Sequence, residues 1–113
     1  MKRFVNTYNC IEGFHYYPNA PEFCSYLANK HRHLFVIRCR FEVTHNEREI
    51  EINQMQGKIQ DDLQYWYGIP CDFDGMSCES IAEHIMGEFE GFNITECQVL
   101  EDGYGGATLT REH

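Results

Sequence analysis

The sequence has 113 residues, enough for one domain with a modest core, and we expect residues 1–113 to form a single domain. A hydrophobic content of 42% and an aromatic content of 14% are typical of a globular chain rather than a disordered one. The formal net charge of -9 argues against binding to nucleic-acid phosphates or to an anionic membrane surface. No apolar run approaches the length of a membrane-spanning helix. From the charge and the short apolar runs together, we expect neither a nucleic-acid partner nor a membrane partner.

The first half of the chain predicts three strands and one long loop. Residues 3–17 are rich in Phe, Val, Tyr and Ile and predict a first strand. Two prolines and an asparagine deny residues 16–30 a regular strand or a long helix, so a sizeable loop is expected there. The strongest strand follows over residues 31–43, where β-branched and aromatic side chains alternate with polar ones. Clean alternation over residues 49–52 predicts a short return strand.

The second half predicts two helices and two more strands. We expect Asn53 to cap a first helix that stops at Gly68, and Ser77 to cap a second that ends at Gly91. Each helix carries one apolar stripe: Met55, Ile59, Leu63 and Trp66 in the first, and Ile81, Ile85 and Phe89 in the second. Strands are then predicted over residues 94–101 and 107–110. Antiparallel hairpins with both helices inserted mid-chain indicate an α+β fold with the helices covering one sheet face.

Six cysteines are spread along the chain, and their surroundings indicate the redox state. No pair has the Cys-x-x-Cys spacing of a thiolate metal site. Several cysteines lie within apolar strand or helix patterns, which favours buried thiols over disulfides. Reduced thiols in turn predict a cytoplasmic protein. The cysteines are Cys10, Cys24, Cys39, Cys71, Cys78 and Cys97.

Two histidines at the start of the strongest strand suggest metal chemistry. Side chains two apart on a strand share a face, so His31 and His33 lie beside Phe35 on the apolar face. A third histidine, His15, ends the preceding strand. Neutral imidazole is a favoured zinc ligand, and catalytic zinc commonly takes three protein ligands with one position open. The alternative is that one histidine is a hydrogen-bonded core residue and the other belongs to the rim.

Four segments carry polar or ionisable residues in a recognisable order along nearly the whole chain. They are His15 with His31-x-His33, the strand-to-helix joint at 53–58, the helix start at 77–82 (Ser-Cys-Glu-Ser-Ile-Ala), and the strand 98–101 (Gln-Val-Leu-Glu). Together they resemble the 6-pyruvoyl-tetrahydropterin synthase and 6-carboxytetrahydropterin synthase family. In that family the helix start reads Thr-x-Glu-Asn-hydrophobic-Ala, and the strand ends in a glutamate.

The resemblance implies a fold, an assembly and a reaction. The fold would be the T-fold (tunnelling fold), an antiparallel four-stranded sheet with two helices on one face that oligomerises into a barrel. A homohexamer, or at least a trimer, would place active sites at subunit interfaces. The reaction would be a zinc-dependent carbon-oxygen or carbon-carbon lyase step that eliminates triphosphate from 7,8-dihydroneopterin triphosphate. The short chain favours the 6-carboxytetrahydropterin type, which belongs to 7-deazaguanine (queuosine) biosynthesis.

The resemblance also implies residue roles. Glu101 would hold the amino-pyrimidinone edge of the pterin, since a carboxylate accepts two N–H donors at once. Ser77 would lie near the pterin, and Cys24 would be the proton-abstracting base. From the pattern alone, a solvated acid at a strand end is the commoner interpretation of Glu101, and N-capping is enough to explain Ser77. The implied zinc ligands are His15, His31 and His33.

The sequence departs from the family's pattern at several positions, and these departures support an alternative function. Six residues separate Cys24 from His31, more than in the family, and Arg32 stands between the histidines in place of glycine. The family's Asp-His pair, which assists the base, is absent from the connection between the helices; Asp72 or Asp74 would be its substitute. The alternative is therefore a T-fold protein that binds a pterin or purine-like ligand without efficient turnover, or a purely structural relative with neither site.

Overall fold

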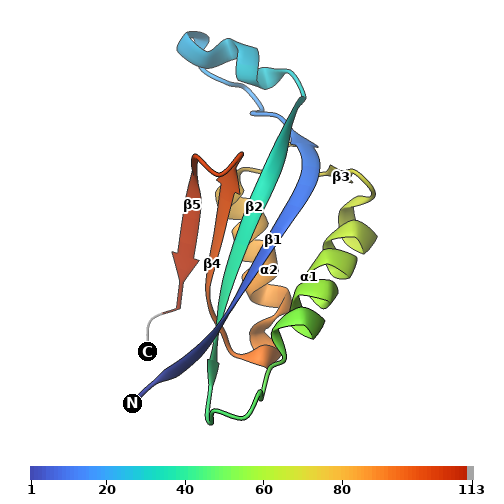
Figure 1. Ribbon diagram of the computed structural model, residues 1–113. Coiled ribbons are helices and arrows are strands. Elements are labelled where there is room, and N and C mark those ends of the chain that lie inside the picture. The colour runs from blue at the N-terminus through green and yellow to red at the C-terminus, as the bar shows by residue number, and fades with distance from the viewer. Residues whose placement is uncertain (112–113) are drawn as a thin grey trace.

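The computed structural model describes residues 1–111 and has a mixed α/β architecture, as the sequence predicts (Figure 1). One five-stranded sheet carries both α-helices on the same face, and a 3-10 helix, η1, projects beyond one end of the sheet. The elements in chain order are β1 (Arg3–His15), η1 (Glu22–Ala28), β2 (His31–Val43), α1 (Ile52–Tyr67), β3 (Cys71–Asp72), α2 (Cys78–Glu88), η2 (Glu90–Phe92), β4 (Ile94–Glu101) and β5 (Gly105–Thr110).

The sheet has five strands, whereas the family resemblance implies four. Its order is β3-β1-β2-β4-β5, and every neighbouring pair is antiparallel except β1 and β3. The extra strand, β3, has two residues and pairs in parallel with Gly13 and Phe14 of β1. Two residues have no hydrophobic period, so this strand leaves no sequence signal and falls within a stretch that reads as a connection.

The expected return strand over residues 49–52 is wrong. The chain bends there instead, and α1 begins at Ile52 with Glu51, rather than Asn53, as its N-cap. The Glu51 carboxylate accepts a hydrogen bond from the Gln54 N–H at 2.6 Å. The Glu49 carboxylate accepts from the backbone N–H and the hydroxyl of Thr44, which closes the preceding loop. These local side-chain bonds give the backbone an alternative to a strand ladder.

The hydrophobic core lies between the sheet and the two helices. Alternate residues of the strands point to the helical face, as a period of two requires. The expected stripes of both helices contribute to the core, and Phe73 from the connection between them joins it. The fully buried side chains include Phe35, Ile37, Phe41, Ile59, Leu63, Ile81, Ile85, Phe89 and Val99.

Helix boundaries follow the expected residues at two ends and differ at a third. Gly68 is the C-cap of α1, with a φ of 92° that favours glycine. The Ser77 hydroxyl caps α2 by accepting from the Ser80 N–H at 3.1 Å. That helix ends at Glu88 rather than at Gly91, because the chain tightens into η2 before the turn to β4.

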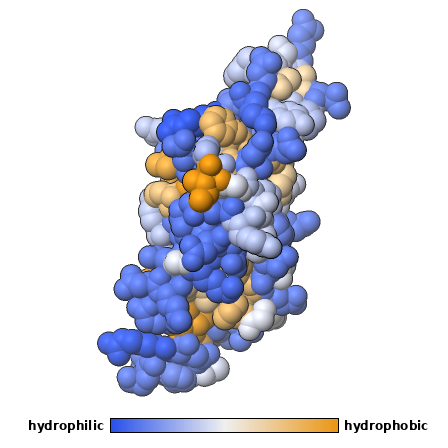
Figure 2. All heavy atoms as spheres, turned by 90° about the vertical axis from the view of Figure 1, so that its right-hand side faces the viewer, coloured by the Kyte–Doolittle hydropathy of each residue, from blue (hydrophilic) through white to orange (hydrophobic). Residues whose placement is uncertain are grey.

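The sheet face opposite the helices is not covered by any element of residues 1–111. Arginines stack over aromatic rings on it, with Arg40 4.4 Å from the ring centre of Phe4 and Arg38 5.2 Å from that of Tyr8. The side of the molecule along α1 is mostly hydrophilic, with apolar residues in small separate patches (Figure 2). Within the described residues, neither helix has the length and apolar character needed to span a membrane.

The hairpin of β4 and β5 gives a test of the sheet, because its two glycines differ in the space around them. A Cβ on Gly106 would lie 1.8 Å from the Val99 carbonyl oxygen, whereas one on Gly105 would have no atom within 4 Å. We therefore expect Gly106→Ala to lower the free energy of unfolding by about 1–3 kcal/mol or more. Gly105→Ala is the matched control and should have a much smaller effect. Equal midpoints of chemical denaturation for the two variants would contradict the β4–β5 register.

Candidate metal centre

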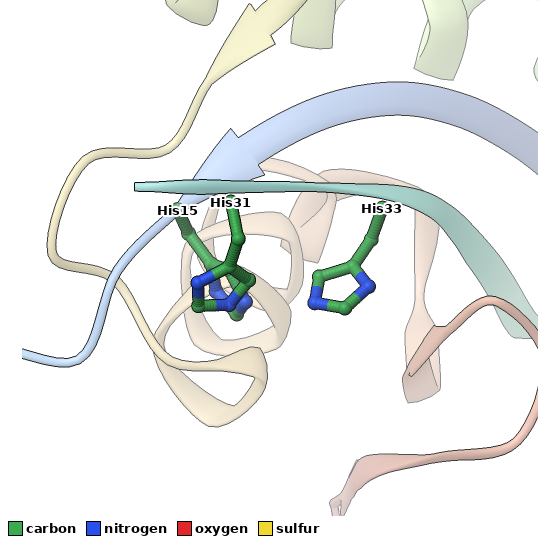
Figure 3. Close-up of side chains that lie close together, drawn as sticks. All are labelled: His15, His31 and His33. Carbon is green, nitrogen blue, oxygen red and sulfur yellow. The ribbon is translucent and has the colours of Figure 1, made fainter. Parts of the chain in front are cut away.

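Three histidines from two neighbouring strands converge at one end of the sheet. The antiparallel register of β1 and β2 places His15 opposite His31 and Gly13 opposite His33. All three rings project to the same side of the strands and point toward one another (Figure 3). One nitrogen from each ring lies within 4.8 Å of the other two. The structure therefore brings together the three imidazoles that the sequence singles out, and the group could hold a metal ion.

Backbone carbonyl oxygens orient two of the three rings. His15 Nδ1 lies 3.0 Å from the Met76 carbonyl oxygen, and His31 Nδ1 lies 2.8 Å from that of Asn29. A carbonyl oxygen only accepts, so each Nδ1 carries the hydrogen and donates it. The other nitrogen, Nε2, is then left with its lone pair exposed to the centre of the group. This tautomer is the one in which imidazole binds a metal through Nε2.

A carboxylate orients the third ring. Asp102 Oδ2 lies 2.7 Å from His33 Nδ1, and its Oδ1 accepts the Leu34 N–H at 2.8 Å. The Leu34 N–H, and after it His33, lower the pKa of Asp102 below the usual value for an aspartate. A histidine backed by a carboxylate is the usual outer shell of a metal ligand. Sequence reasoning missed Asp102, because an acid in a turn next to Gly103 reads as a turn residue.

The state of His15 shows that this arrangement fits a cation. Its side chain is 8% exposed, and burial is the main cause that lowers its pKa from the ordinary histidine value. The ring is therefore neutral at pH 7, which is the form that binds metals. Its Nε2 is buried and has no hydrogen-bond partner among the described residues. A buried polar atom without a partner is costly, and a metal ion is one partner that this lone pair would accept.

Glu101 stands at the end of β4 beside the histidines. Its Oε2 lies 3.0 Å from His15 Nε2, and its Oε1 lies 3.6 Å from His33 Nε2. The Cys78 thiol at the start of α2 donates toward Glu101 Oε2 over 3.7 Å. Burial, followed by the nearby Glu101 charge, raises the pKa of Cys78 to about 12. Cys78 is thus a neutral thiol in the structure as it stands, and sequence reasoning gave it no role.

A cavity of about 500 Å³ opens next to this group. Small-molecule sites commonly enclose about 300–1,000 Å³, so the volume suits a compact heterocycle. Ser77 lies in the lining and also caps α2, so a place near the ligand and a role as N-cap are compatible for this residue. The lining consists of His15, Tyr16, Tyr17, Pro18, Leu27, His31, Gly75, Met76, Ser77, Cys78, Glu79, Ser80, Glu101, Gly105 and Gly106.

Cys24 is the sequence-predicted site residue that does not join the others. It is buried within η1, and its N–H donates to the Pro21 carbonyl. Leu27 of η1 lines the cavity, but Cys24 of the same element is not in the lining drawn from residues 1–111. Asp72 and Asp74 are not in that lining either, and Asp72 pairs with Lys30 at 2.8 Å. The cysteine at the cavity of this chain is Cys78.

Comparisons with known proteins add no assignment to this geometry. No protein-family model matches the chain, and no curated protein matches it. The candidate metal centre is thus defined by its own atoms: three imidazole nitrogens with their hydrogens fixed outward, one carboxylate beside them, and a cavity. Such a set can bind a divalent cation and can polarise an oxygen of a bound molecule.

The carboxylate behind His33 gives a direct test of the metal centre. We expect Asp102→Asn to weaken the binding of a divalent metal about tenfold, because the charge that keeps His33 basic and oriented is lost. Asparagine preserves the size of the side chain and tolerates the positive φ of this position. Competition with a chelator of known affinity measures the effect. Asp61→Asn, an exposed position on α1, is the control, and equal affinities for the two variants would remove Asp102 from the site.

Proposed function

We propose that this protein is a zinc-dependent lyase that acts on a pterin, similar to the 6-carboxytetrahydropterin and 6-pyruvoyl-tetrahydropterin synthases. The observation that carries the proposal is the convergence of three inward-facing imidazole nitrogens beside Glu101 at the edge of a cavity. Three neutral imidazoles are a ligand set typical of catalytic zinc. Bound zinc would supply Lewis-acid polarisation of the oxygens on the substrate side chain.

The carboxylate of Glu101 supports a pterin as the ligand. Its side chain is 36% exposed, so it is open to the cavity rather than sealed in the core. A carboxylate accepts the two parallel N–H donors of an amino-pyrimidinone edge in a bidentate pair. Ser77 stands in the same lining and offers a hydroxyl to the ring. These two residues would bind and orient the heterocycle while the histidines hold the metal.

The proposed reaction needs a proton acceptor, and two cysteines are candidates for it. Elimination of triphosphate needs a base that removes a proton from carbon while the leaving group departs with the bonding electrons. By resemblance the base is Cys24, which in one chain is held in η1 outside the cavity. Cys24 would then act in an assembled oligomer, at a site formed with a neighbouring chain. The rival is Cys78, whose thiol already lies at the cavity beside Glu101.

A second candidate function is favoured by the charge of the cavity. Its lining, drawn from residues 1–111, includes no lysine or arginine, although a triphosphate carries several negative charges. The family's Asp-His pair has no counterpart there. A protein that binds a pterin or purine-like heterocycle without efficient turnover would need the metal and Glu101 but neither of the missing parts. Function belongs to the site rather than the fold, so only turnover separates the two candidates.

We predict weak release of triphosphate from 7,8-dihydroneopterin triphosphate by the zinc-loaded protein. Cys24→Ala should abolish this turnover and leave pterin binding unchanged, because the thiol moves a proton and does not hold the ring. Product analysis by chromatography, together with a binding measurement, checks both parts. Cys10→Ala, at an exposed cysteine of β1, is the control for the removal of a thiol.

The remaining outcomes assign the function differently. Loss of turnover in Cys78→Ala with wild-type turnover in Cys24→Ala would move the base to Cys78. Failure of the wild-type protein to release triphosphate, with a pterin still bound, would favour the binding protein. Elemental analysis of untagged protein, with His33→Ala as the comparison, tests the metal independently. Equal metal content in those two proteins would end both candidate functions.

We also propose that the chain works as a homo-oligomer, a trimer or a hexamer. Within residues 1–111, no element covers the open sheet face or pairs with the outer edge of β5. On the other side, β3 pairs with only two residues of β1. Phe23 and Tyr26 of η1 are 87% and 71% exposed, so this segment offers two aromatic side chains for contact with another chain. Closed cyclic or dihedral symmetry would bury these surfaces in identical contacts.

The assembly proposal predicts a trimer or hexamer by light scattering at micromolar protein concentration. Phe23→Ser should shift the measured mass toward the monomer, since an exposed aromatic that becomes buried between chains contributes about 1.5–3 kcal/mol per contact. Tyr65→Ser is the control, at an aromatic that is 88% exposed on α1. A monomeric wild-type protein would contradict the assembly and any active site formed between chains.

A further inference from the structure

The carboxylate of Glu101 faces two of the three histidines at once. Its two oxygens are divided between them, with Oε2 3.0 Å from His15 Nε2 and Oε1 3.6 Å from His33 Nε2. Glu101 comes from β4, which pairs with β2 so that Glu101 stands opposite Phe35, two residues along from His33. Three strands therefore aim four side chains at one point: His15 from β1, His31 and His33 from β2, and Glu101 from β4.

Hydrogen bonds between neutral imidazoles and the carboxylate do not account for this approach. The hydrogen of His15 is already given to the Met76 carbonyl through Nδ1, and the hydrogen of His33 is given to Asp102 in the same way. In a neutral ring the remaining Nε2 is an acceptor, and a carboxylate oxygen is also an acceptor. If His15 is neutral, two lone pairs face each other at 3.0 Å, whereas a protonated His15 would donate its Nε2–H to the carboxylate. The neutral contact is repulsive unless a cation, either a proton or a metal ion, lies between the two atoms.

The distances agree with those between ligands of one ion. A tetrahedral ion with bonds of about 2.0–2.2 Å separates its ligand atoms by about 3.3–3.6 Å. The two contacts of Glu101, at 3.0 and 3.6 Å, lie close to this range. The histidine nitrogens, within 4.8 Å of one another, would draw together as an ion binds. The Glu101 carboxylate is therefore already close enough to His15 and His33 to bind the same metal ion as they do.

We propose that Glu101 is the fourth ligand of the metal in the protein without substrate. The coordination position that the three histidines leave open would be closed by this carboxylate while the cavity is empty. A second consequence rests on the proposed function: if Glu101 also holds the pterin, it must leave the metal as the pterin enters. The same carboxylate would then keep the empty site closed and recognise the ligand that opens it.

The surroundings of Glu101 allow it to move. Its side chain is 36% exposed, and Gly105 and Gly106 of β5 line the cavity next to it without side chains of their own. The Cys78 thiol, 3.7 Å from Oε2, offers the carboxylate a hydrogen-bond donor on the side of α2. Rotation of one side chain therefore exchanges a metal contact for a contact with bound ligand, and the backbone of β4 does not have to shift.

The test is the affinity for Co²⁺ in the absence of any pterin. Co²⁺ takes the place of zinc and reports its coordination through visible absorption bands. Glu101→Gln should lower the affinity by at least about tenfold, since loss of even an outer-shell partner costs about 10–100-fold. It should also change the band positions, and Glu101→Asp should restore part of the affinity. Glu96→Gln makes the same change of charge on the opposite face of β4 and is the matched control.

The outcomes separate this inference from the proposed function. Equal Co²⁺ affinity and equal bands for Glu101→Gln and Glu96→Gln would overturn the inference, whatever the protein does with pterins. A selective loss in Glu101→Gln supports it, even if no triphosphate is ever released. Addition of 7,8-dihydroneopterin to the Co²⁺ protein tests the exchange. Bands that shift toward those of Glu101→Gln support the exchange, and a bound pterin that leaves the bands unchanged rules it out.

Discussion

The pairing of β1 with β2 is the constraint on which the candidate site depends. Their register runs without interruption from Arg3 opposite Val43 to His15 opposite His31. A slip of one residue would turn every side chain of one strand to the other face. The buried aromatic and aliphatic residues along both strands prevent such a slip, because Phe35, Ile37 and Phe41 are fully buried under the helices. The buried core residues thus fix the strand register, and the register in turn fixes the positions of the histidines.

A second feature of the site is the contrast between its charges and those of the whole protein. The chain carries a net charge of -9, but the centre of the site is three neutral imidazoles with one carboxylate. Each imidazole directs its hydrogen outward to a carbonyl or a carboxylate. The inward surface therefore consists of electron-pair donors. Such a surface attracts a metal cation or a molecule rich in N–H groups.

Sequence reasoning succeeded where a pattern had several residues over which to repeat. The period of two along β2 placed His31 and His33 on the core face, and the stripes of α1 and α2 identified the helical side of the core. It failed over short segments. Two residues of β3 cannot show a period, and the alternating Glu49–Ile52 bends because its acids bond to nearby backbone groups.

In the site, too, residues on a regular strand could be predicted, whereas residues brought close only by the fold could not. The three histidines follow from strand alternation, but Asp102 and Cys78 become visible only when a turn and a helix start meet those strands in space. The role of Cys24 rests on resemblance to the family's loop cysteine, from which its spacing to His31 departs. Distance along a loop does not determine a position in space, so this assignment did not bring the thiol to the cavity of a single chain.

The segment between the paired ends of β1 and β2 has its own physical consequence. His15 and His31 are held opposite each other by the sheet, so residues 16–30 form a closed loop whose two ends are fixed. The entropy of closing a loop grows slowly, by about 0.6 kcal/mol for each doubling of length. Residues can therefore be gained or lost here at little thermodynamic cost to the histidines. Related chains would be free to differ in the length and contents of this loop while the paired histidines stay opposite each other.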